Sequence, residues 1–197
     1  MPENQSLQEI IDFISYIDLL KNVIRKNGLH DASREENTAE HSWHAALSAL
    51  LLAPYADQAL DIDKVIKMLL IHDLVEIEAG DTFVYDREEV AKQGPSEAEA
   101  ADIILSKLPE QQGEILQNLW NEFEARETPE AKFAKAVDRF LPLYSNIINR
   151  GYSWLPYGVT QTHVLEIASI IKDGSSSLWE LVEDMLDQAV QEGYLNP

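Results

Sequence analysis

The chain has 197 residues, with 35 acidic residues against 15 Lys and Arg, so its formal net charge is −20. So acidic a surface disfavours nucleic-acid polymers and anionic membranes, although basic groups or a bound cation can still attract a small anionic substrate locally. The absence of cysteine excludes disulfides, a thiol nucleophile and Cys-ligated zinc. The sequence shows neither a basic leader nor an apolar run of about 20 residues, so we expect a cytoplasmic protein.

Apolar residues recur at helical spacing along nearly the whole chain, and few stretches show a strand pattern. Residues 29–37 are expected to be a polar loop, and 151–158 an aromatic loop. We predict an all-α fold, a single domain over 1–197. Its expected helices cover about 6–26, 38–54, 61–79, 97–108, 111–125, 129–149, 159–172 and 175–192.

Three helix starts carry capping signals. Asn37 precedes a helix with Glu40 at its third position, which is the pattern of a capping box. Ser96 and Glu99 repeat that pattern, and Thr128 precedes a proline at the first helical position. These signals place the helix boundaries more firmly than the apolar spacing does.

The segment LLIHDLVEIEAGD places an imidazole and carboxylates beside an apolar run. His72 and Glu76 are four residues apart and Asp73 and Glu76 three apart, so each pair shares a helix face. Buried charges are costly unless they are paired or bound to a cation, and imidazole with carboxylate suits first-row divalent metals. From spacing alone, a metal site and a surface dyad at the edge of an amphipathic helix both remain open.

Four elements in order resemble the H…HD…D signature of the HD-domain metal-dependent phosphohydrolases, and in particular their 5′-deoxynucleotidase branch. They are His41 in ENTAEHSWHAAL, the His72–Asp73 pair in HDLVEIEAGD, and Asp138 in AKFAKAVD. The similarity covers most of residues 15–145. It implies an HD-domain helical bundle with a metal-site core at about 20–150, on which helices over 159–192 would pack. It also implies that His41, His72, Asp73 and Asp138 bind one divalent ion (Mn, Co, Mg, Fe, Ni or Zn).

The resemblance also implies functions for residues around the metal. Glu76 would be catalytic and transfer a proton, and Asp81 would support the water or the substrate. Arg25, expected at the end of the first helix, and Lys135 would bind the substrate phosphate. The family often has an aromatic residue next to this arginine, whereas here Lys26 follows it.

Other residues have alternative interpretations. Asp138 could instead be a helix-surface acid paired with Lys135 or Arg139, and His44 is expected to pack or cap rather than bind metal. The loop over 123–130 is a candidate for the pocket wall. Four aromatic residues could stack on a base, although a position in the core or in a dimer interface is more typical: Trp43, Tyr152, Trp154 and Tyr157.

The expected function is a metal-dependent 5′-nucleotidase that removes phosphate from nucleoside monophosphates by attack of a metal-activated water. Ile77 stands where guanosine tetraphosphate hydrolases carry an acid, which disfavours that branch. The alternatives are a phosphatase for another small phosphorylated metabolite, and a non-catalytic protein that binds a nucleotide or a partner. The resemblance further implies a homodimer.

Overall fold

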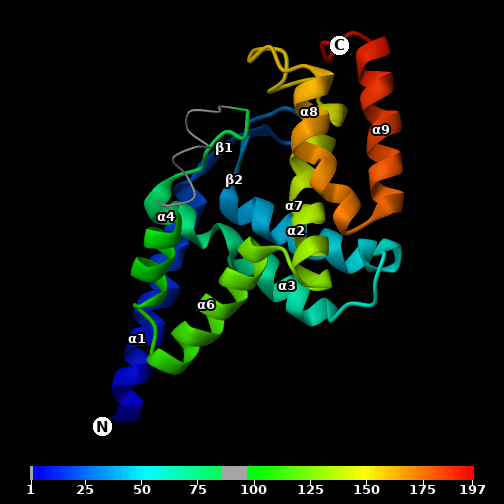
Figure 1. The fold of residues 1–197 in the computed structure, drawn as a ribbon. Coiled ribbons are helices and arrows are strands. Elements are labelled where there is room, and N and C mark those ends of the chain that lie inside the picture. The colour runs from blue at the N-terminus through cyan, green and yellow to red at the C-terminus, as the bar shows by residue number, and fades with distance from the viewer. Residues whose placement is uncertain (1, 86–96) are drawn as a thin grey trace.

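The computed structural model describes residues 2–85 and 97–197, and these are mostly helical (Figure 1), which confirms the predicted all-α class. A helix over 97–105 precedes α6. The other α-helices are α1 (Pro2–Ile17), α2 (Thr38–Leu52), α3 (Ile62–Ile71), α4 (Glu76–Ala79), α6 (Glu110–Ala125), α7 (Pro129–Ile148), α8 (Gln161–Ala168) and α9 (Ser176–Gln191). Within the described residues, four 3-10 helices connect these elements: η1 (Asp18–Asn22), η2 (Ala53–Tyr55), η3 (His72–Val75) and η4 (Ser169–Asp173).

Two of the predicted helix starts are confirmed by their hydrogen bonds. The Asn37 side chain accepts from the backbone N–H of Glu40, whose carboxylate accepts in return from the Asn37 N–H. Thr128 likewise caps α7 through the Ala131 N–H, with Pro129 at the first position. The proposed cap at Ser96 lies outside the described residues.

The prediction of a helix through residue 26 is wrong. α1 ends at Ile17, and after η1 the chain forms strand β1 (Ile24–Gly28), which pairs antiparallel with β2 (Glu35–Asn37). The expected polar loop over 29–37 is therefore wrong at its end, and Arg25 lies on a strand rather than a helix. Long-range hydrogen bonds overrode the apolar spacing here: the Asn149 amide of α7 donates to the carbonyls of Gly28 (3.1 Å) and Leu29 (2.7 Å).

The expected continuous helix over 61–79 is also interrupted. Beyond Ile71 the chain tightens into η3, and the Glu76 N–H then donates to the carbonyls of Asp73 and Leu74 rather than to that of His72. The His72 carbonyl also accepts a hydrogen bond from the indole N–H of Trp120 on α6, at 3.2 Å. A contact across 48 residues thus accompanies the change from α to 3-10 geometry, which is common at functional sites.

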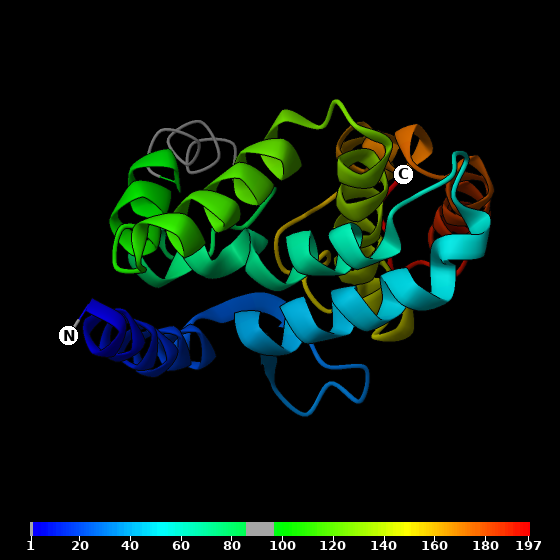
Figure 2. The same cartoon turned by 90° about the horizontal axis from the view of Figure 1, so that it is seen from below.

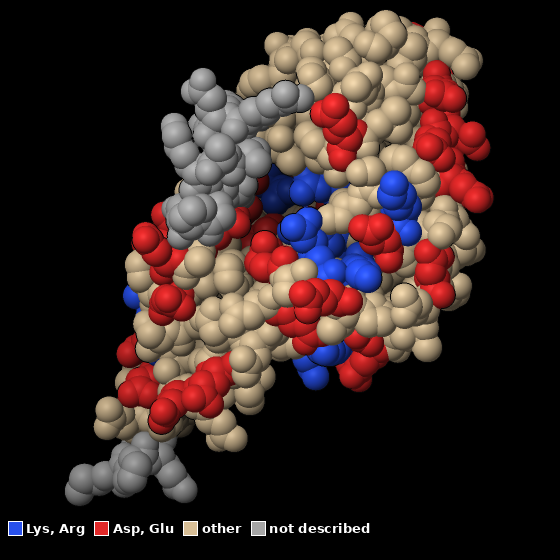
Figure 3. All heavy atoms as spheres, in the orientation of Figure 1, with Lys and Arg blue, Asp and Glu red and all other residues tan. Residues whose placement is uncertain are grey.

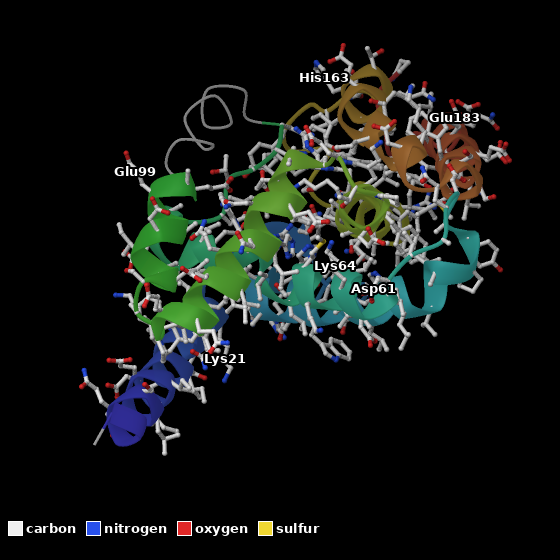
Figure 4. All side chains as sticks on the ribbon, turned by 60° about the horizontal axis from the view of Figure 1, so that its bottom comes forward. Lys21, Asp61, Lys64, Glu99, His163 and Glu183 are labelled. Atoms are coloured by element: carbon white, nitrogen blue, oxygen red, sulfur yellow. The ribbon has the colours of Figure 1, made fainter. Side chains whose placement is uncertain are left out.

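Helix α7 lies at the centre of the fold, in contact with α2, α3, α6, α8, α9 and η4 (Figure 1). Its buried face joins the largest hydrophobic cluster, together with residues of α2, α3 and α9. Figure 2 shows α2 and α3 side by side beside this helix. On the outer side of α3, Lys64 (Figure 4) forms an ion pair with Glu122 of α6 at 2.6 Å, so α3 is held on both sides.

The four aromatic residues differ in burial, so no single interpretation fits them. Trp154 is fully buried in the main core, whereas Trp43 and Tyr157 are 62% and 55% exposed. Tyr157 packs against Phe83, whose backbone segment borders the pocket described below. Within the described residues, no helix has both the length and the apolar character needed to cross a bilayer.

Candidate metal centre

Three elements bring four of the predicted residues together. His41 lies in the first turn of α2, His72 and Asp73 begin η3, and Asp138 lies in the middle of α7. His41, His72 and Asp138 are buried and Asp73 is nearly so. Because the packing of α2, α3 and α7 forms the core, the position of these side chains depends on the tertiary fold.

The ligand-type atoms of this cluster face one another at short range. Asp138 Oδ1 lies 3.0 Å from His41 Nε2 and 3.4 Å from His72 Nε2, and Asp73 Oδ1 lies 3.1 Å from His72 Nε2. One such atom each from His41, His72 and Asp73 can be chosen so that all lie within 4.8 Å of one another. Asp138 contacts both imidazoles of this group, so two imidazoles and two carboxylates lie together.

The hydrogen bonding of His72 suits metal binding. Its Nδ1 lies 2.9 Å from the Leu69 carbonyl, which can only accept, so Nδ1 carries a proton and the lone pair of a neutral ring lies on Nε2. Ligating histidines are commonly oriented in this way. That lone pair faces the oxygens of Asp73 and Asp138, and only a proton or a cation between them removes the repulsion. The residues present fit a divalent ion.

The shifted pKa values of His72 and Asp138 also indicate that positive charge stabilises the cluster. Burial alone would lower the pKa of His72, but the carboxylates of Asp73 and Asp138 raise it to about 10. Burial opposes ionisation of Asp138, yet Lys135 and the two imidazoles hold its pKa well below the ordinary value. Without an ion, a proton on His72 supplies the positive charge that a divalent metal would replace.

Glu76 lies beside the cluster but in a different environment. Its Oε2 accepts a hydrogen bond of 2.7 Å from the Thr38 hydroxyl, and the residue is only 5% exposed. Burial and the neighbouring Asp73 charge raise the pKa of Glu76 well above its ordinary value, although Arg25 opposes this. The Glu76 carboxyl therefore holds a proton more readily than an exposed glutamate does, which suits a group that exchanges protons during a reaction.

Arg25 reaches the same site from β1 and is surrounded by carboxylates. Its Nη1 lies 3.0 Å from Asp73, 3.5 Å from Asp81 and 3.8 Å from Glu76. Gly80 has a φ of 78°, which suits glycine, and turns the chain so that Asp81 faces the pocket. Among the described residues, the hydrogen bond that Arg25 donates at this site goes from Nη1 to Asp73, and Nη2 donates none.

Three of the ligand-type side chains, those of His72, Asp73 and Asp138, border a pocket of about 130 Å³ that opens between β1, η3 and α7, and His41 is buried behind Asp138. Lys135 and Arg139, one turn apart on α7, line its opposite wall, together with Glu124. Lys135 Nζ lies 3.5 Å from Asp138 and 3.6 Å from Glu124. Figure 3 shows basic side chains gathered at this hollow, whereas acidic side chains cover much of the surrounding face.

Seven of the eight predicted site residues therefore line one pocket, and the eighth, His41, is buried beside Asp138; their ligand and catalytic functions stay predictions. His44 lies outside it, stacked against Trp43 and edge-on to His30. Part of the expected loop wall is present, because Glu124 lines the pocket and Phe123 packs edge-on against His72 at a centroid distance of 5.0 Å.

Sequence reasoning missed Arg139 and Thr38 as neighbours of the site. Arg139 was considered only as a surface partner of Asp138, although its spacing of four from Lys135 already places both on one face of α7. Thr38 carried no usable signal, since its contact with Glu76 spans 38 residues.

Several proteins of known structure resemble this chain in sequence or fold. The chain is 46% identical to a protein from Magnetospirillum magnetotacticum described as a predicted metal-dependent phosphohydrolase, whose crystal structure superposes with a TM-score of 0.92 over 97% of this chain and 96% of that one. An HD-domain phosphohydrolase from Listeria innocua, 19% identical, shares the fold with a TM-score of 0.62, over 93% of this chain and 92% of that one.

Curated relatives are more distant in sequence. Human 5′-deoxynucleotidase HDDC2 is 29% identical over 133 residues, which are 67% of this chain and 64% of that protein. The chain thus covers slightly less than two thirds of this relative. A 5′-deoxynucleotidase from Schizosaccharomyces pombe is 27% identical over 136 residues, covering 66% of this chain and 67% of that one. The HD domain family model matches residues 17–179, and the chain belongs to the HD domain family.

Proposed function

We propose that this protein is a divalent-metal-dependent phosphohydrolase that removes the phosphate from nucleoside 5′-monophosphates. The observation that carries the proposal is the buried cluster of His41, His72, Asp73 and Asp138, whose facing atoms lie 3.0–3.4 Å apart with Glu76 beside them. The substrate class is supported by the 5′-deoxynucleotidase relatives. A nucleotide phosphate also suits a pocket that contains both carboxylates and cations.

His41, His72, Asp73 and Asp138 would hold the ion. When bound, a divalent ion supplies Lewis-acid polarisation of a phosphate oxygen and lowers the pKa of a water. The chain contributes the orientation of these ligands: Leu69 fixes the tautomer of His72, and the Trp120 indole holds the backbone of the same residue. The site is thus organised by contacts made before any ligand enters.

Glu76 would act as the general acid and base, which donates a proton to the leaving oxygen and recovers one from the attacking water. Water attacks phosphorus, the bond from phosphorus to the 5′-oxygen breaks, and the Glu76 carboxyl gives its proton to the departing oxygen. The carboxylate then regains a proton from the attacking water, so no net proton is consumed by the residue. The Thr38 hydroxyl holds Oε2 at 2.7 Å, which leaves Oε1 to exchange the proton.

Cations on both sides of the pocket would balance the phosphate charge. Lys135 and Arg139 line the pocket from α7, and Arg25 lines it from β1. The bonds from Nη1 of Arg25 to the acidic side chains also orient Asp73 and Asp81. Arg25 would thus serve in positioning as well as in phosphate binding.

A phosphate-release screen tests the proposal. The full chain is assayed with nucleoside 5′-monophosphates and with Mn, Co, Mg, Fe, Ni or Zn. Asp73→Asn is compared with Asp63→Asn, which removes an exposed charge from the first turn of α3. We expect Asp73→Asn to lose metal binding and turnover together and Asp63→Asn to keep both. Metal-independent turnover by Asp73→Asn would overturn the mechanism. The absence of phosphate release with every combination of nucleotide and metal would overturn the proposed activity.

The size of the pocket favours a second candidate, a phosphatase for another small phosphorylated metabolite. Typical ligand pockets measure about 300–1,000 Å³, and the pocket at the metal centre measures about 130 Å³. The same screen therefore includes sugar phosphates and other small monoesters. Preference for one of them over every nucleotide by kcat/KM would favour this second candidate.

A further inference from the structure

A groove adjoins the metal pocket on the opposite side of Lys135. It lies between the end of α6, the first turns of α7 and the α8–η4 segment, and its volume is about 480 Å³. Lys135 lines both the groove and the pocket, so its side chain forms their shared wall. A ligand whose phosphate lies in the small pocket can extend into this larger space.

The charge of the groove is opposite to that of the molecule. Its lining includes four basic residues, Arg126, Lys132, Lys135 and Lys172, against two acidic ones, Glu166 and Asp173. The whole chain has more than twice as many acidic as basic residues. Figure 3 shows basic side chains on this face extending beyond the hollow. A local excess of positive charge in a protein of net charge −20 attracts a small anion selectively.

The basic groups of the groove are also largely unneutralised. Between described residues, no ion pair within 4.0 Å includes Arg126, Lys132 or Lys172, whereas Lys135 has Glu124 and Asp138 beside it. Other basic residues, such as Arg34 and Lys64, are paired with acids at 2.6 Å. The chain has a large excess of acids that could have paired these three cations, but the structure leaves their charges available.

Two backbone features hold the groove in shape. Arg126 adopts a left-handed conformation at the end of α6, with φ 54° and ψ 34°, where glycine is the usual residue. On the other side, a Cβ at Gly174 would lie 2.7 Å from the Lys132 carbonyl oxygen and from the Phe133 Cα. The chain that follows Lys172 is therefore packed directly on the backbone of α7. The elements that carry Lys132 and Lys172 are thus in close contact with each other.

We propose that this groove is a second phosphate-binding site, in which Arg126, Lys132 and Lys172 bind a phosphate group next to the metal pocket. Guanidinium and ammonium groups together suit this anion, because the first offers a planar pair of donors and the second a mobile point charge. The phosphate can come from two sources. It is either a second phosphate on the ligand whose first phosphate lies at the metal centre, or free inorganic phosphate.

Calorimetric titration of the metal-loaded full chain with inorganic phosphate tests the site directly. The variant Lys132→Gln/Lys172→Gln removes two of its charges, and the single variant Lys172→Gln changes only an exposed side chain. Lys67→Gln is the matched control, because Lys67 is an exposed lysine of α3 away from the groove. Thermal unfolding establishes that each variant is folded.

We expect the double variant to raise the Kd for phosphate in the groove about tenfold and Lys172→Gln about threefold, as the loss of charged hydrogen bonds implies. The titration is repeated after chelation of the metal, and the groove should still bind phosphate. A Kd within twofold of the Lys67→Gln value in both groove variants would overturn the proposal. Since this binding test needs no turnover, it can fail or succeed independently of the proposed hydrolase activity.

The kinetics distinguish the two sources and rest on the proposed function. If the groove holds a second phosphate of the substrate, the double variant raises KM for a nucleoside 3′,5′-bisphosphate about tenfold and leaves KM for the 5′-monophosphate unchanged. If it holds free phosphate, neither KM changes and the calorimetric difference remains. Either result supports the site, provided that the calorimetric difference from Lys67→Gln is present.

Discussion

The hydrogen bond from Trp120 to the His72 carbonyl makes a testable link between the fold and the metal centre. The indole is 7% exposed, and its N–H donates to the His72 carbonyl at 3.2 Å. Trp120→Phe keeps an aromatic ring but removes this donor. The loss of this hydrogen bond costs about 0.5–1.5 kcal/mol, and the smaller ring loses about 1 kcal/mol of packing.

We therefore expect Trp120→Phe to lower the free energy of unfolding by about 2 kcal/mol, which in a chain of this size lowers Tm by about 4–8 °C. Because the same carbonyl belongs to a candidate metal ligand, the metal Kd should rise about 10- to 100-fold, as for other residues that orient ligands. Calorimetry of thermal unfolding and a metal titration measure the two effects.

Trp179→Phe is the matched control for this experiment. Trp179 on α9 is partly buried against the main core, and its indole donates no hydrogen bond to any described residue, so this variant loses packing alone. The stability loss of Trp120→Phe should exceed that of Trp179→Phe by about 0.5–1.5 kcal/mol. The reasoning would be refuted if both variants lost the same stability to within about 0.5 kcal/mol and bound metal as the parent does.

Four further predictions concern the site and the fold. Glu76→Gln should lower kcat by about 10²- to 10⁴-fold while the metal Kd stays constant; unchanged turnover, relative to Glu78→Gln, would remove Glu76 from the reaction. Asn37→Ala should cost about 1 kcal/mol through loss of the α2 cap, measured by urea unfolding, and an unchanged midpoint would contradict it. Gly174→Ala should cost about 1–3 kcal/mol because its Cβ meets the α7 backbone; the test is a fall in Tm. Chelation should also lower Tm, since free metal at 100 times its Kd adds about 2.7 kcal/mol, and an unchanged Tm would argue against a bound ion.

Local sequence signals predicted the features whose causes are local. Asn37 and Thr128 cap helices through backbone groups three residues away, so their neighbours in sequence are sufficient. Glycine at position 80 allows the left-handed turn that directs Asp81 to the pocket, and this too depends on one residue. Apolar spacing placed α7, α8 and α9 because a helical face must meet a core.

Features decided by distant contacts were not predicted. The region around Arg25 continues the apolar spacing of α1, yet it forms a strand because its backbone pairs with β2 and its hairpin is held by Asn149. Likewise, no residue close to His72 in the sequence indicates that the Trp120 indole donates a hydrogen bond to the His72 carbonyl. Such partners are separated by tens of residues, and periodicity within a window of about 18 residues does not include them.

The sequence by itself determined the helical class, the main helix boundaries and the residue types suited to a divalent ion. It also supplied the resemblance that linked His41 and Asp138 to the His72–Asp73 pair. Only the tertiary structure placed Arg25 among carboxylates and Arg139 on the pocket wall, and only it joined α6, α7 and η4 into a basic groove. The physical reason is that caps and amphipathic faces depend on neighbouring residues, whereas burial, ion pairing and pKa depend on which distant side chains the fold brings together.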